Sequence, residues 1–218
     1  KRKSGIYLSV LGVGMYNTSD VTMKTLAENG NGNYAYLDSV EEARKVLVTE
    51  LNGTVNTVAK DAKISVIFNK DVVKSFRLLG YETKMMNRED FEDDQKDAGE
   101  IGSGHTVTAV YELELSAEAG NQAEVARTEL RYKTPDDKTA EPIVTVFTTE
   151  SYSAAPTEDD VFIGCVLEYG LILRKSQYKG DASFAAVISR LGKLQCVQDD
   201  QFKAEFLTVV QKAARLYE

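Results

Sequence analysis

The sequence has few of the residues that build most metal and cofactor sites. It contains one histidine, His105, and two cysteines, Cys165 and Cys196, which do not form a C-x-x-C pair. A Cys/His zinc site needs more ligands than this chain offers. Cys165 falls on the apolar side of a predicted helix, where a buried free thiol is the default. A Cys165–Cys196 disulfide is the alternative if the parent protein is exported.

Basic charge and long apolar runs are also scarce. The 218 residues carry 26 Lys and Arg against 34 Asp and Glu, which gives a formal net charge of −8. A nucleic-acid binder needs a basic footprint, so we expect no nucleic-acid partner, and anionic membrane surfaces are disfavoured in the same way. No stretch approaches the roughly 18–20 apolar residues of a membrane span, and no signal peptide is visible. Because the chain opens KRKSGIYLSVLG without an initiator methionine, we expect it to be a piece of a longer protein.

What the sequence does have is an apolar periodicity that changes twice along the chain. Ile6–Val13 is a continuous apolar run typical of a buried strand, Asp20–Ala27 has the pattern of a short helix, and Tyr34–Leu37 that of a second strand. A capping box at Ser39–Glu42 opens an amphipathic helix that we expect to continue to about residue 58. The first 60 residues therefore predict β-α-β-α, the end of a parallel α/β sheet.

From Lys63 to about Thr149 the apolar residues alternate every two positions, which predicts half-buried antiparallel strands in a sheet or small sandwich. After the linker Ser151–Thr157 the period becomes helical again. The expected strands lie near 64–68, 72–81, 107–115, 126–132 and 144–146, and the expected helices near 158–175, 181–192 and 199–217. The sequence thus predicts an α+β chain.

The stretch Gly12-Val13-Gly14 has the G-x-G spacing of a dinucleotide-binding loop at the end of a predicted strand. Asp38 ends the next strand, roughly where an acid would hold a ribose. The fingerprint requires a third Gly or Ala, however, and Asn17 stands at that position. The helix also begins only near Asp20, too late for a pyrophosphate. We therefore interpret the two glycines as a strand end that turns sharply into a loop.

Three segments carry a resemblance to a known family. "SGIYLSVLGVGMYNTSDVTMKTLAENGNGNYAYLDSVEEARKVLVTEL", residues 4–51, is similar to the last two strands and helices of a von Willebrand factor type A domain in certain bacterial secreted or membrane-anchored proteins. "LLGYETKMMNREDFEDDQKDAGEIGSGHTVTAVYEL", residues 78–113, resembles the uncharacterised extension that follows this domain in the same group, and "LRKSQYKGDAS", residues 173–183, fits that extension too. The resemblance covers nearly the whole chain.

The resemblance implies a domain organisation. Residues 1–58 would be the C-terminal fragment of the type A domain, a remnant of its parallel sheet. Residues 59–218 would be the extension, with strands at about 62–150 and helices at about 158–217. The family's metal-ion-dependent adhesion site has a D-x-S-x-S core with a Thr and an Asp on later loops, and it holds Mg²⁺ or Mn²⁺. Those positions would precede Lys1, so we expect no metal ligand, cofactor-binding residue or catalytic residue in this chain.

One stretch comes close to the metal motif without matching it. Asp181-Ala182-Ser183-Phe184-Ala185 has the first Asp and the first Ser but lacks the second Ser. It also follows Tyr178-Lys179-Gly180 rather than a buried strand. We interpret Asp181 as a helix N-cap.

The function that the resemblance implies is non-catalytic binding of another protein or surface component at the cell envelope, with the extension supporting or orienting the adhesion domain. The competing hypothesis is a hydrolytic or metal-assisted enzyme, whose parts would be His105 and the acidic run Glu89–Glu100. The carboxylates of that run are dense enough for Ca²⁺, but their spacing misses the EF-hand loop and favours a solvated loop anchored by Phe91 and Ala98. Because His105 is the only histidine and has no evident nucleophile nearby, a structural, hydrogen-bonded role is favoured for it.

The resemblance also implies a way to self-associate. In the type A fold the strand Ile6–Val13 would lie between Tyr34–Leu37 and a further strand. A cut at Lys1 would remove that neighbour and leave an unprotected apolar edge, which pairs with whatever strand it meets. We therefore expect a homodimer joined through residues 1–58.

Overall fold

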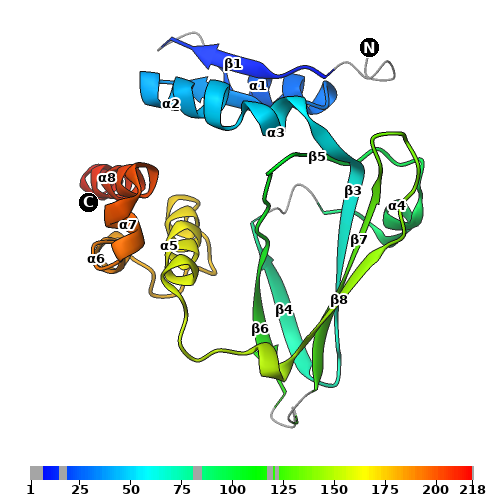
Figure 1. Ribbon diagram of the computed structural model, residues 1–218. Coiled ribbons are helices and arrows are strands. Elements are labelled where there is room, and N and C mark those ends of the chain that lie inside the picture. Colours follow the sequence, from blue (N-terminus) through cyan, green and yellow to red (C-terminus); the bar gives the residue numbers. More distant parts are fainter. Residues whose placement is uncertain (1–6, 15–18, 81–84, 117–119, 121–122, 218) are drawn as a thin grey trace. The chain divides into compact units, whose positions relative to one another are not determined.

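The computed structural model describes residues 7–14, 19–80, 85–116, 120 and 123–217. Their contacts divide the chain into two compact units (Figure 1). The first comprises residues 1–77, 81–109 and 113–150, and the second comprises 78–80, 110–112 and 151–218. Helices occur together with antiparallel sheets, as expected for an α+β chain. The boundary expected at residue 58 stays a prediction.

The first unit begins with two parallel strands joined by a helix. Strand β1 (Val10–Val13) pairs with β2 (Tyr34–Leu37), and Val10 lies opposite Tyr34. Helix α1 (Asp20–Asn29) makes the crossover that parallel strands require. It begins at Ser19, whose side chain accepts a hydrogen bond from the Thr22 amide. Residue 6 lies outside the described residues, and the strand begins at Val10, so its described part is shorter than the expected Ile6–Val13.

The two glycines of the G-x-G stretch have separate structural roles. A Cβ atom on Gly12 would collide with the side chain of Met23 on α1, so this glycine allows the helix to approach the strand. Gly14 has φ = 99°, which side-chain-bearing residues rarely adopt. These roles support the interpretation of a strand end that turns into a loop. Residues 15–18, including Asn17, lie outside the described part of the chain.

The segment after β2 is helical but not one continuous α-helix. Ser39 caps it as expected, because its side chain accepts a hydrogen bond of 3.1 Å from the Glu42 amide. The expectation of a helix to residue 58 is wrong: Asn56 is already extended and Val58 belongs to the next strand. Gly53 and two β-branched neighbours have low helix propensity, which favours an early end. The segment consists of α2 (Val40–Arg44), a π-helix (Lys45–Thr49) and α3 (Leu51–Val55).

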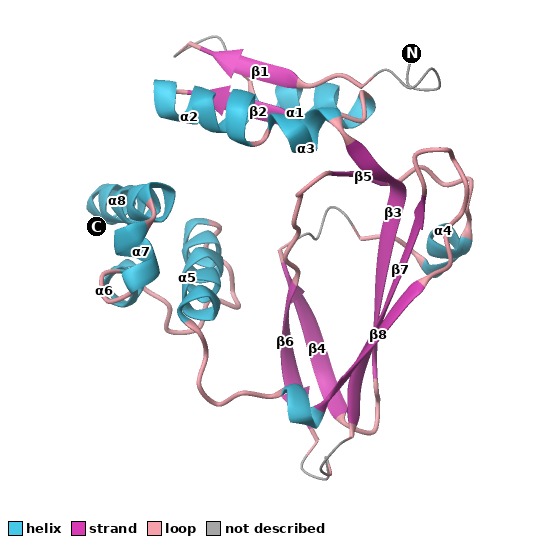
Figure 2. Cartoon of the chain, in the orientation of Figure 1, coloured by secondary structure: helices cyan, strands magenta, loops and turns pink. Residues whose placement is uncertain are grey.

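The largest sheet of the described residues is antiparallel and has four strands, in the order β5-β3-β7-β8 (Figure 2). The register places Ile64, Leu130 and Ile143 in one row across it, and Phe68, Ala126 and Phe147 in another. Both rows lie on the same face, because partners in register point to one side of a sheet. The strands are β3 (Thr57–Phe68), β5 (Gly99–Gly102), β7 (Glu124–Lys133) and β8 (Ile143–Thr148).

Strands β4 (Val73–Leu79) and β6 (Val110–Leu115) form a separate two-stranded sheet. The strand expected from Val107 begins three residues later, at Val110, and Val107 lies exposed in the loop that follows β5. A short helix, α4 (Arg88–Glu92), precedes β5, and Asn87 caps it. The acidic run therefore starts in a helix and ends in a strand.

The second unit contains four helices among its described residues, where three were expected. Asp200 explains the difference: its backbone is extended, and its carboxylate accepts hydrogen bonds from the amides of Phe202 and Lys203, so a new helix begins there. The region predicted as one helix over 199–217 therefore contains the end of one helix and the whole of another. The helices are α5 (Glu158–Leu173), α6 (Phe184–Leu191), α7 (Gln195–Asp199) and α8 (Gln201–Tyr217).

A continuous apolar core holds the helices of the second unit together. Cys165, Val187, Leu191 and Val210 are fully buried in it. Edge-to-face contacts of aromatic rings from α5 and α8 add to the packing. Among the described helices of the chain, none is long and apolar enough to cross a bilayer.

Candidate functional site

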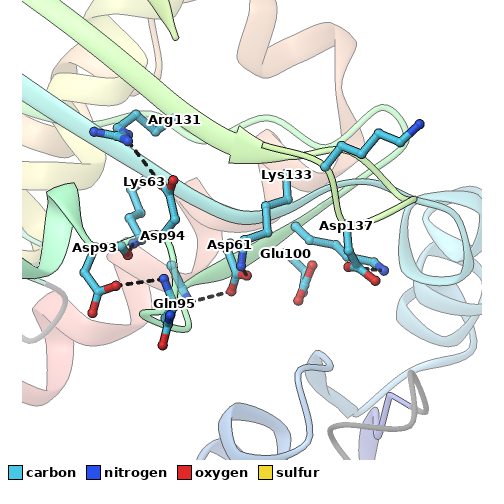
Figure 3. A network of polar contacts seen from close by, with 12 residues as sticks. Asp61, Lys63, Asp93, Asp94, Gln95, Glu100, Arg131, Lys133 and Asp137 are labelled. Carbon is cyan, nitrogen blue, oxygen red and sulfur yellow. Dashed lines mark hydrogen bonds and ion pairs between the residues drawn. The ribbon is translucent and has the colours of Figure 1, made fainter. Parts of the chain in front are cut away.

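A network of charged side chains is built on strands β3 and β7 (Figure 3). In the register, Lys60 lies opposite Lys133 and Lys63 lies opposite Arg131. Strand β3 thus advances three residues where β7 advances two, which is a β-bulge with one extra residue on β3. Asp61 lies in the bulge with φ = 49°. The bulge brings the four cations onto one face of the sheet, and we call them the cation ladder.

Asp61 and Asp137 neutralise one end of the cation ladder. The Asp61 carboxylate lies 2.7 Å from Lys133 Nζ and also accepts a hydrogen bond of 3.0 Å from the Ala98 amide. Lys60 Nζ lies 2.9 Å from the Asp137 carboxylate and donates to the Pro135 carbonyl. Asp61 therefore links the ladder to the segment that leads into β5.

The other end of the ladder holds the acidic run. Lys63 is only 6% exposed, and its ammonium group donates to the backbone carbonyls of Asp90, at 3.0 Å, and Asp93. A buried ammonium group needs such acceptors, because desolvation without them is costly. The Arg131 guanidinium lies 3.1 Å from the Asp94 carboxylate and 5.8 Å from the centre of the Phe91 ring. Two cations of the sheet, Lys63 and Arg131, therefore hold the acidic run in place.

The outcome for the acidic run is mixed. Most of its carboxylates are exposed, as expected, and only Asp90 and Glu100 are partly buried. Its anchors differ from the expectation, because Lys63, Arg131 and Asp61 hold it in addition to Phe91 and Ala98. In the described stretches no group of three or more His, Cys, Asp or Glu side chains is placed to hold a metal ion. Whether the run binds calcium stays a question for titration.

Glu100 is the carboxyl group of this network with a raised pKa. Burial is the main cause, and the nearby charge of Asp61 adds to it, while the hydrogen bond from Asn31 and the charge of Lys60 act in the opposite direction. Asn31 Nδ2 donates to Glu100 Oε1 at 3.1 Å. The other oxygen, Oε2, is buried, and no partner for it occurs among the described residues. Glu100 therefore takes up a proton at a higher pH than an ordinary glutamate does.

His105 lies outside this network. It is exposed in the loop after β5, and its backbone amide donates to the Gly102 carbonyl at 3.0 Å. Among the residues that the structure describes, no contact joins its imidazole to a nucleophile. Its structural role stays a prediction, and so does its part in the competing enzyme hypothesis.

The two cysteines lie in the helical unit as free thiols. Cys165 is fully buried, as expected, and burial raises its pKa. Cys196 is partly buried against the same core. Its backbone amide, together with that of Gln195, donates to the carboxylate of Glu158 at the start of α5, and these bonds lower the pKa of Glu158. Glu158 thus caps helix α7 from another helix.

Asp181 is not the N-cap of α6. It lies in a turn, and Ser183 is the N-cap, with a side chain that accepts a hydrogen bond of 3.3 Å from the Ala186 amide. The expectation was wrong because both residue types are good N-caps, and the helix begins two residues later than predicted.

Sequence reasoning did not identify Lys63 and Arg131. Both occupy positions that alternate with apolar residues, so they resemble ordinary solvent-facing side chains of a half-buried strand. Their partners are 30 and 37 residues distant in the chain. The one local signal is the charged stretch Lys60-Asp61-Ala62-Lys63, which interrupts the alternation where the bulge lies.

Comparisons with known proteins place the chain in a family. The family model described as "Uncharacterized protein YfbK, C-terminal" matches residues 53–216. "Uncharacterized protein YfbK" of Escherichia coli (strain K12) is 33% identical over 230 residues, covering 98% of this chain and 40% of the relative. The chain therefore spans about two fifths of the length of the curated relative. No solved structure matches it. The chain belongs to the family of YfbK C-terminal domains.

Proposed function

We propose that the chain is a non-catalytic part of a bacterial cell-envelope protein with a von Willebrand factor type A domain, and that it helps to bind another protein or a surface component. The proposal rests on the resemblance of residues 4–51 to the end of a type A domain, with its parallel sheet. The relative is uncharacterised, so the comparison supplies no function of its own.

The observation that carries the proposal is the parallel β1-α1-β2 arrangement with its uncovered apolar side chains. Parallel strands usually belong to sheets that are buried on both faces. Here Leu11 is 41% exposed, Val13 65% and Val21 on α1 74%. An apolar surface of this kind marks a contact with other protein, either the rest of a larger sheet or a partner. This supports an interaction role for residues 1–58.

Binding to envelope fractions tests the proposed function. Biolayer interferometry of the purified chain against bacterial envelope fragments should give saturable binding that protease treatment of the fragments abolishes. Val21→Lys should weaken this binding, whereas Leu216→Lys, at an exposed position on α8, is the matched control and should not. Absence of saturable binding, or equal loss with both variants, would contradict the proposal.

The competing enzyme hypothesis has its own readout. If His105 is a catalytic residue, a hydrolytic turnover by the purified chain should disappear in His105→Ala while the melting temperature stays the same. The acidic carboxylates give this hypothesis little support, because Asp94 pairs with Arg131 and Asp90 pairs with Lys96. We therefore keep the binding module as the proposed function.

Self-association through residues 1–58 also stays a proposal. Among the described residues β1 pairs with β2 alone, so one edge of each strand is open. Leu11→Lys places a charge in β1 and should reduce any dimer that forms through this edge. Sedimentation analysis of this variant beside the unchanged chain gives the answer.

A further inference from the structure

Strand β8 has the features of a docking edge. It is the last strand of the four-stranded sheet, and within the described part of the chain it pairs with β7 alone (Figure 2). Its sequence, Ile143-Val144-Thr145-Val146-Phe147, consists of β-branched and aromatic residues, which favour strands. The four apolar side chains are between 42% and 52% exposed. An apolar edge strand of this length is a template for pairing with another strand.

The backbone groups on the open side of β8 follow from one hydrogen bond. The Asn69 amide, next to the end of β3, donates to the Val125 carbonyl of β7 at 3.0 Å, so Ala126 and Thr128, the partners of Phe147 and Thr145, direct their backbone groups to β8. Successive residues of an antiparallel strand direct their N–H and C=O groups to opposite sides. The backbone N–H and C=O groups of Phe147 and Thr145 therefore point to β7, and those of Val144 and Val146 point to the open side.

Strand β8 lacks the usual protection of an edge. Proteins commonly place charges, prolines or bulges on exposed edge strands. Between Glu141 and Glu150 the chain carries no charged residue, and Pro142 precedes the strand rather than interrupting it. The opposite edge of the sheet, β5, has four residues, two of them glycines, and its pairing with β3 is irregular. Of the two edges of this sheet, β8 is the longer and uncharged one, and its register with β7 is unbroken from Ile143 to Phe147.

We propose that β8 pairs antiparallel with β8 of a second copy of this chain, about a two-fold axis. An axis at Thr145 places Val144 opposite Val146 of the second copy and Ile143 opposite Phe147. Pairs of β-branched and aromatic side chains stabilise antiparallel sheets. Val144 and Val146 then exchange the backbone hydrogen bonds of their open sides. The contact is isologous, so it closes as a dimer.

The side chains of the sheet support a second copy as the occupant. The apolar row Ile64, Leu130 and Ile143 of one copy would continue into the row Phe147, Ala126 and Phe68 of the other. Net charge of −8 opposes self-association in general, but no like charges face one another across this uncharged strand. The result is one continuous sheet made of two four-stranded halves.

Analytical ultracentrifugation of the full 218-residue chain over a range of concentrations tests the proposal. The unchanged chain should form a dimer. Val146→Pro removes an N–H group that points to the open side and is not used by β7, so it should raise the dissociation constant at least about tenfold. Val146→Ala keeps the N–H group and is the matched control, which should retain the dimer.

A second pair of variants guards against misfolding of the proline variant. Val144→Lys puts a charge on the open edge, and Ile67→Lys puts one on the same face of the sheet but on the central strand β3. The proposal requires that only Val144→Lys weakens the dimer, with circular dichroism unchanged in both. A chain that is monomeric at every concentration overturns the proposal. A dimer that survives Val144→Lys, or that is lost in Leu11→Lys alone, also overturns it, the latter in favour of the β1 edge.

Discussion

The helical unit and the four-stranded sheet are held together by different kinds of contact. In the helical unit, nine buried apolar residues form one cluster that includes the large side chains of Phe184 and Leu191. In the sheet, the buried apolar residues are the small Ala59 and Ala126, and the one buried charged residue is Lys63. Small side chains bury little apolar area and therefore contribute little free energy.

The two regions therefore obtain their stability from different interactions. The helical unit depends on apolar packing, which is non-directional and tolerates changes at its surface. The sheet depends on backbone pairing and on the cation ladder, whose contacts need particular donors and acceptors. Four substitutions, taken in order of decreasing expected effect, test whether the two regions differ in this way.

Replacement of Leu191 by alanine should have the largest effect. Leu191 is fully buried, so the lost packing and the cavity should reduce the free energy of unfolding by about 2–5 kcal/mol. Urea denaturation followed by circular dichroism measures the loss. Leu216 is also a leucine but is 84% exposed, so Leu216→Ala is the control. Its free energy of unfolding should stay within about 0.5 kcal/mol of that of the unchanged chain. Equal losses would show that the helical core is not packed as described.

Lys63→Met should have the next largest effect, and it should act on the sheet. The methionine replaces the apolar stem of the lysine side chain but leaves the carbonyls of Asp90 and Asp93 without their donor, at a cost of about 1–3 kcal/mol. Hydrogen exchange should increase in the acidic run and not in helices α5 to α8. Lys70→Met, at an exposed position after β3, is the control. Unchanged exchange in the acidic run would show that Lys63 does not hold it.

Glu158→Gln should destabilise the helical unit less, and with a defined pH dependence. The amides of Cys196 and Gln195 lower the pKa of Glu158, so its contribution is present above the ordinary glutamate pKa and is lost as the pH falls through the lowered value. The gap in melting temperature between the unchanged chain and the variant should therefore be widest at neutral pH and close on acidification. Glu205→Gln on α8 is the control, and a gap independent of pH would argue against the charge-assisted cap.

Glu100→Gln should have the smallest effect and the opposite sign. Burial and the charge of Asp61 raise the pKa of Glu100, so its contribution is present below the ordinary glutamate pKa and is lost as the pH rises through the raised value. The permanently neutral variant should be more stable than the unchanged chain at neutral pH, with a slightly higher melting temperature, because solvent screens the partly exposed carboxylate. The gain should vanish in acid. Glu141→Gln, at an exposed position, should show no gain.

Local signals in the sequence predicted much of the fold. The start of α5 at Glu158 was predictable because the capping residues precede an apolar helical pattern, and Thr157 forms a capping box with Asp160. The strands β3, β7 and β8 were predictable because apolar residues recur at every second position in each of them. These features depend on residues within a few positions of one another.

Features that depend on distant residues were not predictable. The contact of Lys63 with the acidic run requires a particular register between strands, which alternation alone does not specify. The breaks at Asn56 and Asp200 have local causes, but the apolar period continues across both positions and so predicts one uninterrupted helix at each. Asp181 and Ser183 are both good N-cap residues, so the sequence alone does not determine that Ser183 caps α6.

The bulge at Asp61 has a consequence for how the length of β3 can change. In a regular strand Lys60 and Lys63, three positions apart, would point to opposite faces of the sheet, and one of them would share the face of the apolar rows of Ile64 and Phe68. Relatives should therefore either keep the bulge or be one residue shorter between positions 60 and 63, a change that leaves the two cations on one face. At position 61 itself they should keep Asp, Asn or Gly, the residues that best tolerate a positive φ.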